Sequence, residues 1–319
     1  MQLKDIHKVA MIGAGTMGSG ISMCFAQAGY HVALYSRTAE GIQRALNRMA
    51  HSQQVFIQEG LISEAEAQAA RSRIRGTDSL PEALRGVQYV LESVPENLAL
   101  KQALFREMES LCPPETILAT NTSGLSITAI ASACRYPQRV GGMHWANPPE
   151  IVPLVEVIRG EQTSDETMDI IYGLSQRLGK VPVRVQKDIP GFASNRLQYA
   201  LLREALYLVQ EGVVSAEDVD RTLKNGVGFR YPWLGPLETA DLGGLDVFHT
   251  ICQYLFKELS TMTKTPAFFD EIVQGGNYGI KTGRGFYDYT GKSREQILRK
   301  RDLYFLRQLK LLREIQEME

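Results

Sequence analysis

Cysteine is scarce in this chain of 319 residues, and its four cysteines stand far apart. They are Cys24, Cys112, Cys134 and Cys252, with no C-x-x-C pair and no histidine spaced to join them. This spacing argues against both a disulfide framework and a zinc site. We therefore expect a cytoplasmic protein that needs no metal.

Long apolar runs and an excess of one charge are also missing. No run approaches the roughly 20 apolar residues that cross a membrane, and no signal-peptide core precedes the first expected strand. The 35 basic and 36 acidic residues give a net charge of −1 without long blocks of one sign. We expect neither a nucleic acid nor a membrane as partner. The length and the 44% hydrophobic content suit two domains with their own cores.

A glycine-rich turn near the start of the chain predicts a dinucleotide site. The pattern G-x-G-x-x-G follows an expected strand, Val9–Ile12, and opens a helix that ends near Gly29, before a second strand, His31–Tyr35. The first glycine permits the tight turn, the second lets a pyrophosphate approach the backbone, and the third allows close packing of helix and strand. The expected phosphate-binding residues are Gly13, Gly15, Thr16, Met17 and Gly18.

The end of the second strand bears on the choice of cofactor. An NAD site usually carries an acid here for the ribose hydroxyls, but this chain has Ser36, Arg37 and Thr38. The missing carboxylate removes a repulsion, and the arginine and two hydroxyls could bind a 2′-phosphate. We therefore predict that NADP is favoured over NAD. The alternative is that Arg37 stacks on the adenine and NAD still binds.

Alternating strands and helices continue to about Val185 and then give way to helices. This order predicts an α/β protein, with an N-terminal Rossmann-type doubly wound sheet followed by an all-helical C-terminal domain. We expect a dinucleotide-binding domain at residues 1–187 and a helical substrate and dimerisation domain at 188–319. Further strands are expected at Val87–Val94, Thr116–Asn121, Val140–Trp145, Ile151–Ile158 and Val181–Val185, and helices at Ala39–Met49, Ser63–Arg73, Leu98–Leu111, Ser164–Leu178 and Ala193–Gln210.

A histidine and an acid stand out on two expected strands separated by a proline turn. His144 lies in an apolar run, and Glu156 is flanked by Val155 and Val157, so its ionisation needs a compensating partner. A carboxylate bonded to one ring nitrogen would leave the other nitrogen free to act as a base. The alternative is a core histidine without chemistry beside an edge-strand acid that faces solvent.

The order Ser123, His144, Asn147-Pro148-Pro149, Glu156, Pro190-Gly191-Phe192, Asn195 resembles the L-3-hydroxyacyl-CoA dehydrogenase superfamily. The resemblance runs from Val9 to Tyr289. It implies a substrate site made by Ser123, His144, Glu156 and Asn195, with Asn147 nearby, although Ser123 and Asn195 could also be simple helix caps. It also implies that Glu96 and Lys101 lie beside the nicotinamide ribose rather than being plain surface charges. The crevice rule for open sheets adds Pro95 and Asn121, which follow neighbouring strands.

Arg230, in GVGFRYPWLGP, bears on the substrate. A guanidinium among glycines and aromatics suits a carboxylate, although it could instead stack on Tyr231 or Trp233. With PGFASNRLQYA, this segment resembles the branch of lambda-crystallin and L-gulonate 3-dehydrogenase, which implies a free 3-hydroxy acid as substrate.

Three further interpretations concern CoA, turnover and assembly. No lysine lies between Lys8 and Lys101 to hold CoA, although Arg44 and Arg48 could replace it, so an acyl-CoA substrate stays as an alternative. A nucleotide-binding protein without turnover, like a crystallin, is a second alternative. The charged helix expected at Ser293–Glu319 carries an apolar stripe, and we expect a homodimer.

Overall fold

The computed structural model describes residues 1–316 and divides the chain into two compact units. The first unit is Met1–Arg196 and the second begins at Leu197. The first unit runs past the boundary expected after residue 187, because residues 193–195 bond to Glu156 and Ser123.

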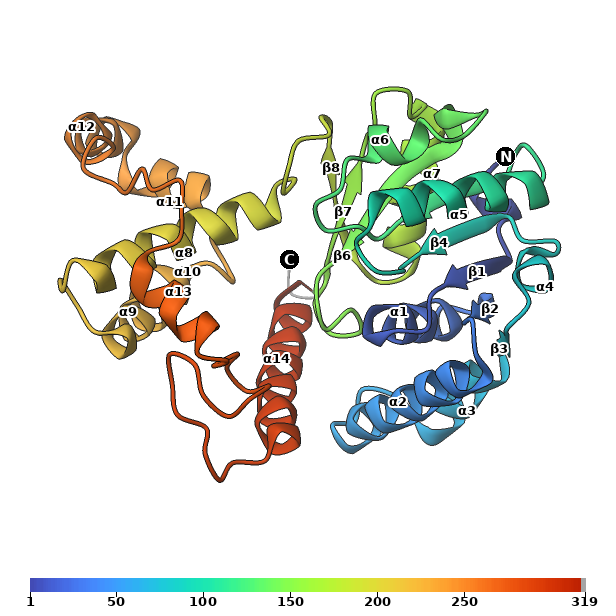
Figure 1. Ribbon diagram of the computed structural model, residues 1–319, viewed down its shortest axis with the longest axis horizontal. Helices are drawn as coiled ribbons and strands as arrows, with labels where there is room; N and C mark the ends of the chain where they lie inside the picture. Colours follow the sequence, from blue (N-terminus) through green and yellow to red (C-terminus); the bar gives the residue numbers. More distant parts are fainter. Residues whose placement is uncertain (317–319) are drawn as a thin grey trace. The chain divides into compact units, whose positions relative to one another are not determined.

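The first unit is built on an eight-stranded sheet whose strands run in the order β3-β2-β1-β4-β5-β6-β7-β8 (Figure 1). All neighbours are parallel except β6 and β7, which are antiparallel. The strands are β1 (Lys8–Ile12), β2 (His31–Tyr35), β3 (Ile74–Thr77), β4 (Tyr89–Glu92), β5 (Ile117–Thr120), β6 (Val140–Trp145), β7 (Leu154–Ile158) and β8 (Val181–Val185). This confirms the predicted doubly wound sheet.

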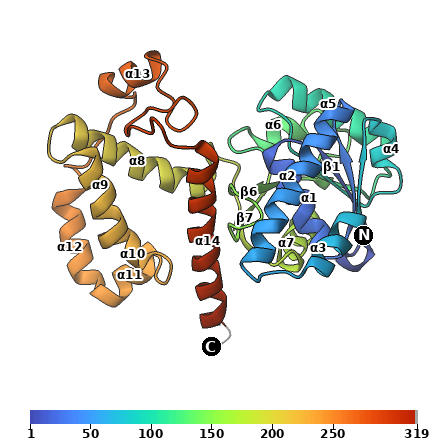
Figure 2. The same ribbon diagram turned by 90° about the horizontal axis from the view of Figure 1, so that it is seen from below.

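Helices cover both faces of the sheet and enclose two cores (Figures 1 and 2). One core lies under α1 and α7 and contains Phe25, Tyr89 and Trp145; the other lies under α4, α5 and α6 and contains Phe105. The helices are α1 (Thr16–Gln27), α2 (Ala39–Gln58), α3 (Glu64–Ser72), α4 (Leu80–Leu84), α5 (Leu98–Leu111), α6 (Ile127–Ala131) and α7 (Asp165–Arg177), with short 3-10 turns η1 (Leu3–Asp5) and η2 (Pro137–Arg139).

Most elements lie where the sequence predicts them, and the exceptions have physical causes. The Ser63 capping box begins α3 as expected, since Ser63 and Glu66 exchange bonds. Helix α2 runs to Gln58 rather than Met49, and β4 is shorter than predicted. The edge strand β3 and the five-residue α4 were not predicted, because neither is long enough to show an apolar period.

The second unit consists of helices and loops with two isolated bridges around Arg284 (Figure 2). Its long first helix, α8 (Ser194–Gln210), starts within the first unit. The others are α9 (Ala216–Thr222), the π-type η3 (Leu223–Val227), α10 (Gly228–Arg230), α11 (Pro236–Gly243), α12 (Leu245–Leu255), α13 (Ala267–Gln274) and α14 (Arg294–Gln316). The last three residues of the predicted tail helix lie outside the described residues. Over residues 1–316, no helix has the length and apolar character needed to cross a membrane.

Candidate active site

The glycine turn between β1 and α1 leaves open space at one of its three glycines. At the other two, protein atoms leave no room for a side chain. Gly13 has φ +116°, and a Cβ there would lie 2.5 Å from Ser93 O; a Cβ on Gly18 would lie 1.9 Å from Gly13 O. A Cβ on Gly15 would meet no protein atom within 4 Å. Packing therefore requires Gly13 and Gly18. The open space at Gly15 fits the approach of a pyrophosphate to the start of α1.

A cavity of about 800 Å³ opens from this turn along the carboxyl ends of the strands. It contains ten of the predicted site residues, which lie in the loops after β1, β2, β4 and β5 and in the first turn of α1. These are Gly13, Gly15, Thr16, Met17, Ser36, Arg37, Pro95, Glu96, Asn121 and Ser123. Tyr35, Ser93 and the α5 residues Leu100, Ala103, Leu104 and Glu107 also line it and were not predicted. An extended molecule such as a dinucleotide fits this arrangement.

Three predicted cofactor residues do not line the cavity. Gly18 lies beneath Gly13 in the helix packing. Thr38 is the N-cap of α2, where its hydroxyl accepts a hydrogen bond from Gly41 N. Lys101 is 1% exposed, and its ammonium is directed to Glu92 rather than into the cavity. The predicted place of Lys101 beside the nicotinamide ribose stays a prediction.

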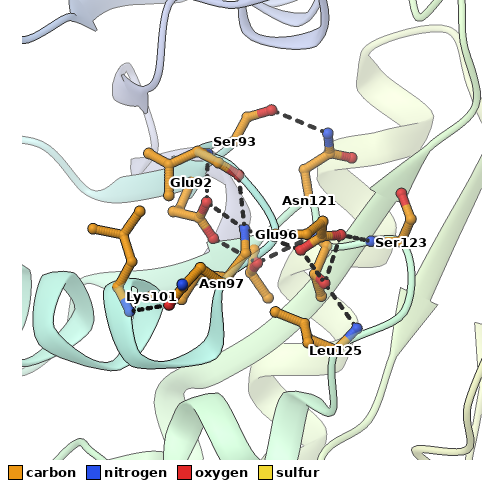
Figure 3. Close-up of polar contacts among 12 residues, drawn as sticks. Glu92, Ser93, Glu96, Asn97, Lys101, Asn121, Ser123 and Leu125 are labelled. Atoms are coloured by element: carbon orange, nitrogen blue, oxygen red, sulfur yellow. Dashed lines mark hydrogen bonds and ion pairs between the residues drawn. The ribbon is translucent and has the colours of Figure 1, made fainter.

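Lys101 instead belongs to a buried polar network that reaches the cavity wall (Figure 3). Its Nζ lies 2.6 Å from Glu92 Oε1 and 3.5 Å from Glu96 Oε2. Glu96 in turn accepts hydrogen bonds from Thr122 Oγ1 and from Ser123 N, the latter at 2.6 Å. The network thus fixes the loop that carries Ser123.

Two arginines of α2, Arg44 and Arg48, share the adenosine end of the cavity with Arg37. Arg48 donates to Ala14 O at 2.5 Å and to Ser19 Oγ, so it holds the glycine turn from behind. Burial, together with the nearby charge of Arg44, lowers the pKa of Arg48. Within residues 1–316, neither Arg37 nor Arg44 takes part in an ion pair. This end of the cavity is therefore electropositive.

His144 and Glu156 face each other across the antiparallel pair β6 and β7. They are direct partners in the register, and His144 Nδ1 lies 2.8 Å from Glu156 Oε2. Both side chains are buried, with 7% and 0% of the residue exposed. The next residue, Trp145, donates its backbone N–H to Asn121 Oδ1, which ties this strand to the cavity wall.

The charge of Glu156 is stabilised although the group is buried. Burial acts to raise its pKa, but hydrogen bonds from His144, from the hydroxyl and amide of Ser194 and from the amide of Ala193 lower the pKa to about 2. The carboxylate is therefore ionised at neutral pH. It holds the proton of the imidazole on Nδ1 and leaves Nε2 free to accept one.

Ser123 and Asn195 are joined directly. Asn195 Nδ2 donates to Ser123 O at 2.9 Å, so the loop after β5 and the first turn of α8 meet beside the dyad. Asn147 is exposed in the turn after β6. Lys180 steadies this turn from below by donating to Pro149 O and Val152 O. The predicted set Ser123, His144, Glu156 and Asn195 is thus gathered within the first unit.

Arg230 lies in the second unit, at the end of α10, and its side chain is exposed. The π-type turn η3 directly precedes this helix. Such turns occur often at functional sites. No bond of its side chain to Tyr231 or Trp233 is seen, and its role stays a prediction.

Two residues of the site were not identified from the sequence. Ser194 contributes two of the bonds to Glu156, and Glu92 is the buried partner of Lys101. Ser194 directly precedes Asn195, a predicted site residue, and this position could have indicated that Ser194 also lies at the site. Glu92 ends an apolar strand, and a carboxylate in that position needs a buried cation, which could have pointed to Lys101.

Comparison with known families assigns both halves of the chain. The model for the 3-hydroxyacyl-CoA dehydrogenase NAD binding domain matches residues 8–189, and the model for the C-terminal domain of the same enzymes matches residues 191–289. The two matches meet between β8 and α8, close to the predicted domain boundary.

Individual relatives cover nearly the whole chain. A 5-formyl-3-hydroxy-2-methylpyridine 4-carboxylate 5-dehydrogenase of Mesorhizobium japonicum is 38% identical over 89% of this chain and 91% of its own length. A probable 3-hydroxybutyryl-CoA dehydrogenase of Bacillus subtilis is 40% identical over 91% of this chain and 99% of its own. Lambda-crystallin homologues of rat and mouse match at 35% and 36% identity, consistent with the resemblance noted above.

The same similarity appears among solved structures. The crystal structure of a 5-formyl-3-hydroxy-2-methylpyridine 4-carboxylic acid 5-dehydrogenase, described as an NAD⁺-dependent dismutase, superimposes with a TM-score of 0.89 at 35% identity. The superposition covers 97% of this chain and 99% of that one. The relatives therefore include enzymes of free acids as well as enzymes of CoA thioesters.

Proposed function

Since this chain belongs to the 3-hydroxyacyl-CoA dehydrogenase family of NAD-dependent oxidoreductases, we propose that it interconverts a 3-hydroxy and a 3-oxo acid with His144 as acid and base. The observation that carries this proposal is the 2.8 Å contact between His144 Nδ1 and Glu156 Oε2, next to Trp145, whose backbone N–H bonds to the cavity residue Asn121.

The residues have separate tasks in this reaction. The glycine turn and the cavity beside it would hold the nicotinamide dinucleotide, which would supply the acceptor for a hydride from the substrate C3. His144 Nε2 removes the proton of the 3-hydroxyl, and Glu156 stabilises the imidazolium that results. Ser123 and Asn195 hold the reacting oxygen. In the reverse direction His144 returns the proton to the carbonyl oxygen.

A free hydroxy acid is our proposed substrate class. Arg230 provides a planar guanidinium for a carboxylate, with the π-type turn η3 directly before it. Arg48, which could have replaced a CoA-binding lysine, donates a hydrogen bond to Ala14 O in the glycine turn. This bond supports a substrate without CoA. An acyl-CoA substrate is the alternative, and the relatives that act on 3-hydroxybutyryl-CoA favour it.

NADP is our proposed preferred cofactor. Arg37 and Arg44 line the adenosine end of the cavity, where Ser36 follows β2 in place of an acid. A charge-assisted bond to a phosphate contributes about 1.5–3 kcal/mol, so Arg37→Ala should lower kcat/KM for NADP by roughly 10- to 100-fold and leave NAD nearly unchanged. A wild-type kcat/KM that is higher with NAD than with NADP would overturn the preference.

The activity is tested with purified protein, NAD or NADP, and a panel of 3-hydroxy acids and 3-hydroxyacyl-CoA esters, followed by nucleotide absorbance. His144→Gln should reduce kcat by about 10²- to 10⁴-fold, and His31→Gln, at the far end of β2, should not. Tight nucleotide binding without turnover of any panel member would instead support a non-catalytic, crystallin-like protein.

Assembly and location are further parts of the proposal. The second unit exposes large apolar side chains on α11 and α12, among them Leu237 and Leu242, and we propose that a second copy of the chain covers them. A monomer mass by light scattering at micromolar concentration would exclude this. The four cysteines are unpaired, which supports a cytoplasmic location.

A further inference from the structure

Glu156 is held by the beginning of a helix as well as by His144. Its Oε1 accepts hydrogen bonds from the backbone amides of Ala193 and Ser194, both at 2.9 Å. These amides lie at the start of the 17-residue helix α8, where the backbone N–H groups and the helix dipole favour an anion.

The other oxygen of Glu156 is shared between two donors. Oε2 accepts from His144 Nδ1 at 2.8 Å and from the hydroxyl of Ser194 at 2.6 Å. The hydroxyl therefore competes with the imidazole for the same lone pairs and the same negative charge. A change in the strength of one of these hydrogen bonds therefore changes the strength of the other.

We propose that Ser194 is a positioning residue that tunes the base strength of His144 by drawing charge from the shared Oε2 of Glu156. This inference rests on the proposed function, in which His144 transfers the proton. With the hydroxyl present, Oε2 has less negative charge to offer the imidazole, so Glu156 stabilises the imidazolium less.

Three charged groups of β8 and the segment around the start of α8 bond to partners other than the dyad. Asp188, before α8, accepts from Ser126 Oγ and Thr128 N. Arg184 of β8 pairs with Asp169, and Arg196 of α8 donates to Pro190 O. The ring of Phe192 fills the space beside the imidazole, with ring centroids 5.8 Å apart.

Loss of the hydroxyl should leave the carboxylate in place. Glu156 would keep three of its four bonds, including both helix amides, so its position is fixed without Ser194 Oγ. The expected effect is therefore on the pH profile rather than on folding. A carboxylate that binds the imidazolium more strongly raises the pH at which the base becomes free, by about half a unit to one unit.

The test compares the pH profile of kcat/KM for alcohol oxidation in wild type, Ser194→Ala, Ser194→Thr and Ser126→Ala. Ser194→Ala should move the midpoint of the acidic limb upward by about half a unit to one unit, and the midpoint for carbonyl reduction in the same direction. Ser194→Thr keeps a hydroxyl and should restore the wild-type midpoint. Ser126→Ala removes a serine-to-carboxylate bond of the same 2.6 Å length, at Asp188, and should leave the midpoint unchanged.

Two outcomes overturn the inference. One is a Ser194→Ala enzyme with a lower plateau and an unmoved midpoint, which would make the serine merely structural. The other is a midpoint that moves downward. Failure of the proposed function looks different: wild type would show no turnover, or His144→Gln would keep both full activity and the acidic limb.

Discussion

The buried pair of Glu92 and Lys101 should stabilise the first unit only while both charges are present. Lys101 Nζ lies 2.6 Å from Glu92 Oε1, and neither residue is more than 1% exposed. In Lys101→Met the carboxylate keeps two donors, Val94 N and Thr120 Oγ1, but loses its counter-charge. Removing one partner of such a pair costs about 3–5 kcal/mol in the free energy of unfolding.

The double variant Glu92→Gln/Lys101→Met leaves no buried charge. It loses the hydrogen bonds of the pair, which contribute about 0.5–1.5 kcal/mol each, and keeps most of the packing. Its cost should therefore be smaller than that of Lys101→Met alone, with a coupling energy between the two positions of about 3 kcal/mol.

Urea unfolding followed by tryptophan fluorescence can measure this in the first unit alone. The chain has two tryptophans, of which Trp145 is buried in the core of the first unit and Trp233 is half-exposed in the second. In a Trp233→Phe background the signal reports on the first unit. Additive costs, within about 0.5 kcal/mol, would refute the view that the pair acts as one buried element.

Three further predictions concern the cofactor turn, the acid limit of stability and the substrate turn. Gly15→Ala should keep the stability of the fold and raise the Kd for nucleotide at least tenfold, because the new Cβ meets no protein atom and enters the space expected for the ligand. Gly18→Ala should lower the melting temperature, because its Cβ would meet Gly13 O. Equal melting temperatures of the two variants would contradict this. The pKa of Glu156 is about 2 when folded, against a reference of 4.5, so its stabilisation of roughly 3 kcal/mol is present above pH 4.5 and lost as the pH falls toward 2. Acid titration of the unfolding free energy should show a flatter curve over that range in Glu156→Gln. Lys180→Met should cost about 1–3 kcal/mol in urea unfolding, because the carbonyls of Pro149 and Val152 lose their donor, and an unchanged midpoint would exclude that role.

The sequence predicts the nucleotide half of the fold well because its signals are local. The glycine turn, the strand that precedes it and the helix that follows lie within one short stretch, and each glycine has its own steric reason. The pairing of His144 with Glu156 was also predictable, since two strands joined by a proline turn become neighbours. The edge strand β3 was not predictable, because its four residues, of which one is buried and one exposed, are too few to show a period.

The sequence predicts which segments meet better than it predicts the protein partners of individual side chains. Lys101 was expected beside the nicotinamide ribose, yet a residue nine positions earlier, Glu92, draws its ammonium into the core. Thr38 was expected at the ribose and caps a helix instead. Each side chain has a protein group nearby that can bond to it as well as a ligand could. The spacing of residues in the sequence does not show which of the two it will bind.

The proposed chemistry is easier to infer from the sequence than the proposed substrate. All four predicted catalytic residues lie within residues 1–196, because the first turn of α8 is bonded to Glu156 and Ser123. His144 and Glu156 lie on two adjacent strands and are direct partners in the register, so the local order of the chain is enough to predict their pairing. Arg230, whose role is a prediction, ends a helix of three residues in the second unit. An element that short carries no periodic pattern, so the sequence gives less information about its surroundings than about the dyad.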